Sequence, residues 1–150
     1  MKNIFAWLAN PSIPQQVFDI TMLFFRATVC MEMIFVHGFK KLGIGSAEAE
    51  KVPNPLHLPE VFNYAFAVSA NTFFPFLVLI GLCTRLATLP TLAVTLTGYF
   101  VLHWNDPFLT RDGPFIYSAI FLLILILGPG KYSIDNYIYK ITSTKLAWQL

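Results

Sequence analysis

Residues 23–41, LFFRATVCMEMIFVHGFKK, are apolar enough to form most of a membrane-spanning helix, yet they include Arg26, Glu32 and His37. A spanning α-helix needs about 20 mostly apolar residues. A charged side chain at the centre of a bilayer costs about 2.5–3.5 kcal/mol, so ionisable residues within a span normally face the bundle interior and have partners there. This stretch therefore predicts a membrane helix whose ionisable residues contact other helices.

The composition of the whole chain also indicates a membrane protein. Of its 150 residues, 56% are hydrophobic and 12% are charged, and the mean hydropathy is +0.62. Soluble domains are about 25% charged. Hydrophobic segments occur at about residues 18–37, 61–82, 86–103 and 114–127. We expect one domain over residues 1–150, an all-α membrane protein built as a bundle of four transmembrane helices.

The charge and cysteine content argue against several other classes. The formal net charge is +2, and there is no run of five or more like charges, so binding to nucleic acid is not expected. Cys30 and Cys83 are far apart and form no CxxC pair of the kind used in thiol exchange or metal binding. We expect both cysteines to be inert and predict no metal site.

The segments around the spans carry helix-breaking signals. Pro75 lies inside the second segment, where a proline frees a carbonyl one turn earlier and favours a kink. Asp112, Gly113 and Pro114 predict that the fourth helix starts near residue 114. GPGKYSIDNYIYK, residues 128–140, then predicts the end of that helix and a short C-terminal amphipathic segment at the membrane interface.

Four spans place both termini on the same side of the membrane. Lysine and arginine are commoner in cytoplasmic loops. The terminal side would hold Lys2, Arg85, Lys131, Lys140 and Lys145, and the other side Lys40, Lys41, Lys51 and Arg111. This small excess favours cytoplasmic termini.

The polar residues of the first span fall on two separate lines. At about 100° per residue, one line along the helix contains Asp19, Met22, Arg26, Cys30, Met33, His37 and Lys40. A second line contains Thr21, Thr28 and Glu32. Arg26 and Glu32 therefore cannot neutralise each other within the helix. Each needs a partner from another helix.

The third span offers a polar face. Thr88, Thr91, Thr95 and Tyr99 recur at helical spacing, and His103 and Asp106 follow them. Such hydroxyls could satisfy a guanidinium, although threonine in a membrane helix more often bonds its own backbone or a neighbouring helix. His37 and His103 end two spans on the same side and could ligate haem, but without an attachment motif haem is the less favoured cofactor.

Three ordered motifs resemble the DoxX family: HGFKKLG at 37–43, LVLIGLCTRLATL at 77–89 and LLILILGPGKYSID at 122–135. The resemblance covers about residues 18–138 and implies a small four-helix bacterial membrane protein. The resemblance implies that some members are similar to a subunit of thiosulfate:quinone oxidoreductase and that others are linked to membrane oxidoreductase assemblies. Distant eukaryotic relatives act as membrane chaperones or cargo receptors. The chain departs from the pattern at Asn71, where many members are acidic, and at Phe74 and Pro75, where many have a Gly-Gly pair.

The residues and the resemblance together suggest a polar pocket that opens to the outer face. Its expected members are Arg26, Glu32, His37, Lys41, Asn71, Tyr99, His103 and Asp106, with Arg26, Glu32 and His37 as the catalytic candidates. The favoured hypothesis is a quinone-binding subunit of an oxidoreductase system in the bacterial inner membrane, which would need a protein partner or a second copy. The alternatives are a non-catalytic accessory subunit or chaperone, and a small-solute or ion pathway.

Overall fold

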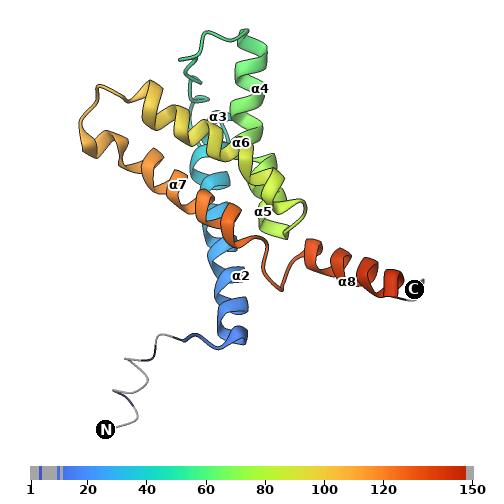
Figure 1. Ribbon diagram of the computed structural model, residues 1–150. Coiled ribbons are helices and arrows are strands. Elements are labelled where there is room, and N and C mark those ends of the chain that lie inside the picture. Colours follow the sequence, from blue (N-terminus) through green and yellow to red (C-terminus); the bar gives the residue numbers. More distant parts are fainter. Residues whose placement is uncertain (1–3, 5–9, 11, 148–150) are drawn as a thin grey trace.

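The computed structural model (Figure 1) describes residue 4, residue 10 and residues 12–147. Lys2, which the charge count used, lies outside them. The described residues form helices and no strand. Four helical segments are long and apolar enough to cross a membrane: Gln15–Lys41, Glu60–Ile80, Thr84–Leu102 and Phe108–Leu127. The prediction of an all-α membrane protein with four spanning helices is confirmed.

Three of the four spans are composed of more than one element. The first consists of α2 (Gln15–Glu32), the π-helix η1 (Met33–Gly38) and α3 (Phe39–Lys41), and the second consists of α4 (Glu60–Asn71) and α5 (Phe73–Ile80). The third joins α6 (Thr84–Thr97) to the π-helix η2 (Gly98–Leu102), and the fourth is α7 (Phe108–Leu127). A further helix, α8 (Ile134–Ala147), points away from the spans (Figure 1).

The fourth helix starts earlier than the sequence suggested. We expected its first turn near residue 114, but α7 begins at Phe108 and Pro114 lies inside it. Pro107, in an extended conformation, precedes the helix, and its carbonyl accepts the amide of Thr110 at 3.0 Å. Pro107 therefore provides the start signal that we had assigned to Pro114. Within a helix, Pro114 leaves only the carbonyl one turn before it without an amide partner.

The second span is interrupted at Thr72, whose φ of −127° and ψ of −72° lie outside the helical region. Pro75 has no amide hydrogen to bond to the carbonyl of Asn71, four residues before it. The kink predicted from Pro75 is therefore confirmed. It leaves the Asn71 carbonyl exposed to contacts from other helices.

The core lies where α2, α5, α6 and α7 meet. Its fully buried apolar side chains include Cys30, Val78, Phe121 and Ile124. Thr88 and Thr91 of α6 are buried too, and their hydroxyls bond helix backbone. Thr91 Oγ1 donates to the carbonyl of Ala70 in α4 at 2.7 Å, and Thr88 Oγ1 donates within its own helix to Thr84 at 2.7 Å.

Arg26 is almost completely buried, with 1% of its surface exposed, and it joins α2 to the connection between α7 and α8. Its Nη1 donates to the carbonyl of Pro129, and its Nη2 donates to that of Tyr132 at 2.7 Å. Nε has no partner among the described residues. The expected interhelical partner of Arg26 therefore exists, but it is loop backbone rather than the threonines of α6.

Asp135, in the first turn of α8, closes the same end of the bundle. Its carboxylate accepts the amides of Cys83 and Thr84 at 2.7 and 2.8 Å and the Thr84 hydroxyl at 2.8 Å. It therefore caps the start of α6 from outside that helix. Its own amide donates to the Gly81 carbonyl at 2.8 Å. We call the contacts of Arg26 and Asp135 with these turns the terminal latch.

Replacing Asp135 with alanine should lower the free energy of unfolding by about 3 kcal/mol, because three hydrogen bonds to a charged acceptor are lost. Unfolding in detergent, followed by circular dichroism during titration with SDS, would measure the change. Asp112→Ala is the matched control, since Asp112 is exposed and makes no hydrogen bond or ion pair within the described region. Equal midpoints for the two variants would contradict the latch.

Candidate functional site

A cavity of about 140 Å³, partly open to the outside, lies between the four spans, all of which contribute to its walls. It is lined by Met33, His37, Lys41, Asn71, Val94, Thr95, Gly98, Gly113, Pro114 and Tyr117. Three of the eight residues predicted from the sequence, His37, Lys41 and Asn71, are among them. The cavity lies toward the loops that follow the first and third spans, away from the terminal latch.

Each of the four spans has an irregular helix where it lines the cavity. The first and third spans contribute their π-helices, η1 and η2, and the second contributes Asn71, which directly precedes the break at Thr72. The fourth contributes Pro114. Short π-helical turns within α-helices occur frequently at functional sites. The widened and broken helices leave a space between the four spans that regular helices would fill with packed side chains.

Gly38 allows the first span to approach the break in the second. A Cβ atom at this position would lie 2.5 Å from both the Asn71 carbonyl oxygen and the Thr72 Cγ2. Only a residue without a side chain fits there. The glycine of the HGFKKLG motif therefore sets the position of the Asn71 wall relative to the His37 wall.

Three polar side chains of the cavity, those of Asn71, His37 and Tyr117, have no hydrogen-bond partner among the described residues. Asn71 is only 3% exposed, and its side-chain amide makes no hydrogen bond to any described residue. The same holds within the described region for the half-buried His37 ring and the Tyr117 hydroxyl, whose rings meet edge to face at 5.0 Å. These groups are therefore available to hydrogen-bond a ligand.

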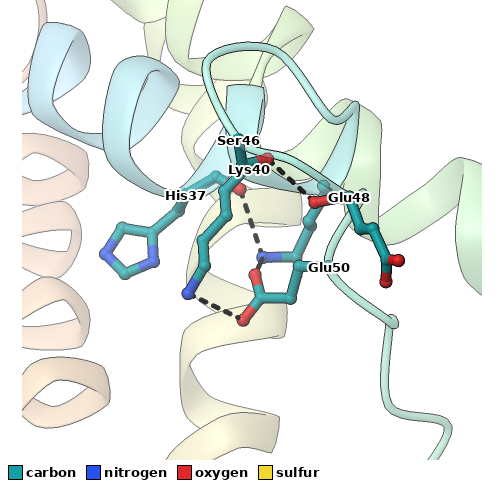
Figure 2. Close-up of polar contacts among 6 residues, drawn as sticks. His37, Lys40, Ser46, Glu48 and Glu50 are labelled. Carbon is teal, nitrogen blue, oxygen red and sulfur yellow. Dashed lines mark hydrogen bonds and ion pairs between the residues drawn. The ribbon is translucent and has the colours of Figure 1, made fainter.

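Lys41 adds a positive charge at the loop end of the cavity. Its Nζ donates to the His37 carbonyl at 3.3 Å and lies 3.7 Å from Glu50 Oε2, while Lys40 Nζ lies 3.4 Å from Glu50 Oε1. Figure 2 shows the His37 ring pointing away from the Lys40–Glu50 pair. The Glu50 carboxylate thus pairs with both lysine ammonium groups, and the His37 imidazole remains available to a ligand in the cavity.

The π-helix η1 explains why the helical projection of the first span fails at Lys40. A π-helical turn adds about one residue to the repeat, so residues beyond it are rotated by one position relative to a regular helix. Lys41, rather than Lys40, therefore occupies the inward-facing position. The Lys41 side chain is 12% exposed and that of Lys40 is 58% exposed. The predicted line therefore holds from Asp19 to His37, whose members are buried or line the cavity, and it fails at Lys40.

The remaining candidates lie outside the cavity. Arg26 belongs to the terminal latch, and Glu32 is exposed on the outer side of α2. Tyr99 packs against Arg111, whose guanidinium carbon lies 4.3 Å from the ring centroid, and His103 Nδ1 pairs with Asp106 Oδ2 at 2.7 Å. The single eight-residue pocket is therefore not formed. The cavity also includes Tyr117, which was not among the residues expected from the sequence.

Comparison with known proteins identifies the family of this chain. The model of the DoxX family matches residues 21–104. The chain belongs to the DoxX family. A Haemophilus influenzae protein, described as uncharacterized, is 29% identical over 101 residues, which cover 64% of this chain and 67% of that protein. No solved structure matches. In this DoxX protein the matched region includes His37, Lys41 and Asn71, whereas Tyr117 lies beyond it.

Gly38→Ala should destabilise the protein by about 2 kcal/mol, because the added methyl group overlaps the Asn71 carbonyl and the neighbouring helices must separate. The midpoint of SDS unfolding measures this effect. Gly113→Ala is the control, since a Cβ at that helical position meets nothing within 4 Å. Equal loss in both variants would argue against the close approach at Gly38.

Cysteine labelling can test the rotation caused by η1. In a Cys83→Ser background, Lys40→Cys should react with a membrane-impermeant maleimide about tenfold faster than Lys41→Cys, because thiol reactivity follows exposure. The rates can be read from gel shifts of the protein in membranes. A regular helix through residues 33–38 would reverse the order.

Proposed function

We propose that this DoxX protein is the membrane subunit of an oxidoreductase system and that its cavity binds the ring of a quinone. The unpartnered Asn71 amide, buried beside His37 and Tyr117, supports this proposal most strongly. The cavity volume of about 140 Å³ also suits a single ring, since an engineered protein cavity of about 150 Å³ binds benzene.

The lining residues suit the two polar edges of such a ring. The Asn71 amide can donate a hydrogen bond to one carbonyl, and the His37 imidazole or the Tyr117 hydroxyl can donate to another. Apolar contact would come from Met33 and Val94. When bound, a quinone accepts two electrons and two protons. The Lys41 charge at the loop end would favour added negative charge in the cavity.

The electrons would have to come from a partner protein. Among the described residues, Cys30 is buried and Cys83 is exposed, so they form no dithiol, and no group of three or more His, Cys, Asp or Glu side chains could hold a metal. We therefore assign the chain the role of a subunit. We place it in the bacterial cytoplasmic membrane with both termini in the cytoplasm.

Asn71→Leu should lower the quinone content of the purified protein about tenfold, because an apolar side chain of similar size cannot make the hydrogen bond at this buried site. Quinone would be extracted from protein in mild detergent and quantified by mass spectrometry against protein concentration. Asn105→Leu, in an exposed loop, is the control. Equal quinone in the two variants, or none in the wild type, would contradict the proposal.

One observation favours a second candidate, a non-catalytic accessory subunit. Arg26, the most deeply buried charge, is engaged in the terminal latch rather than in the cavity. Buried charges in this chain can therefore hold the fold together without chemistry. Quinone-free protein that still assembles with its partner would support the accessory role.

A further inference from the structure

Glu32, the last residue of α2, has no partner among the residues that the structure describes. Its side chain is exposed, and it forms no hydrogen bond or ion pair with the rest of the described structure. About 14 Å of helix separates it from Lys41 at the end of the span. Because the hydrocarbon core is about 30 Å thick, this places the carboxylate within the hydrocarbon.

The surroundings of Glu32 form a continuous outer face of α2. Phe24, Thr28 and Glu32 follow one another at four-residue spacing, and Thr21 and Phe35 extend the same side. All five residues are exposed. The Thr28 hydroxyl bonds back to the carbonyl of Phe24 at 2.9 Å, so it offers Glu32 no donor. We call these five residues the α2 outer face.

We propose that the α2 outer face docks a transmembrane helix of the partner subunit, which presents a lysine or arginine side chain to Glu32. This inference rests on the proposed function to the extent that the partner is the electron donor required there. An ionisable side chain facing acyl chains is costly, and such residues in spans are normally paired. Since the described residues supply no pair, we infer that the complementary charge comes from another protein.

A second copy of the chain fits this face poorly. Symmetric packing would bring a second carboxylate to the first. The exposed cations of the described residues outside α8, which are Lys40, Lys51, Arg85 and Lys131, lie at span ends or in connections rather than at the depth of Glu32. A different protein with a cation at mid-span meets the requirement directly.

The position of the α2 outer face also suits a donor of electrons. Glu32 directly precedes η1, whose Met33 and His37 line the cavity. A helix docked at Glu32 would therefore cover the side of the bundle next to the cavity. The partner and the ring would then occupy adjacent positions.

Photo-crosslinking in native membranes tests this proposal. p-Benzoylphenylalanine would replace Phe24 or Phe35, which conserves an aromatic side chain on either side of Glu32. Phe73, an exposed residue near the middle of the second span, is the control position. The expected adduct is a transmembrane peptide with lysine or arginine within about one helical turn of the crosslink. Position 73 should give lipid adducts.

Substitutions at Glu32 then test the charge. The protein adduct should fall about tenfold in Glu32→Gln and persist in Glu32→Asp, because only the latter keeps the charge that a cation pairs with. Adducts with lipid alone, with a second copy of this chain or with a helix lacking a cation would each overturn the proposal. Quinone extracted from the same wild-type membranes reports separately on the cavity, so the two proposals can fail independently.

Discussion

The hydrocarbon core of a bilayer supplies no hydrogen bond to a polar group. This constraint explains how the chain arranges the polar residues of its spans. Each such group inside a span must find its partner within the chain, in a ligand or in another protein. Arg26 finds two backbone carbonyls. Asn71 and His37 find none among the described residues and face a cavity. Glu32 finds none and faces outward. The three cases correspond to three different roles.

The two ends of the bundle differ in structure: one is closed by hydrogen-bonded turns and the other contains irregular helices. At the terminal end, Arg26 and Asp135 draw the turns after α5 and α7 together through short bonds to backbone groups. This end carries the Gly81 turn and the Gly128–Gly130 turn, which belong to two of the three motifs that resemble the family. Toward the other end, helix irregularities in all four spans open a cavity. A rigid closed end allows the loosened end to keep its shape, since its helices are fixed at a distance from the site.

The proposals for the cavity and for the α2 outer face depend on the same geometry. The π-helix η1 begins directly after Glu32 and contains His37, so it separates an outward carboxylate from an inward imidazole within one turn. A ligand in the cavity and a helix on the outer face would therefore contact opposite sides of one short segment. Coupling between partner and ligand would pass through that segment.

The sequence by itself determined the four spans, the kink at Pro75 and the need of Arg26 for a partner, because these follow from hydropathy, from proline chemistry and from the cost of charge in hydrocarbon. It also identified His37, Lys41 and Asn71. Only the tertiary structure decided that Arg26 and Glu32 lie outside the cavity and that Tyr117 belongs to it. Arg26 and Glu32 precede the π-helix, and their places follow from which turns pack against α2. For Lys40 and Lys41, the reason is that the projection assumed an unbroken α-helical repeat. The π-helix η1 changes that repeat, and the packing of Gly38 on the Asn71 carbonyl shows where the changed helix must fit.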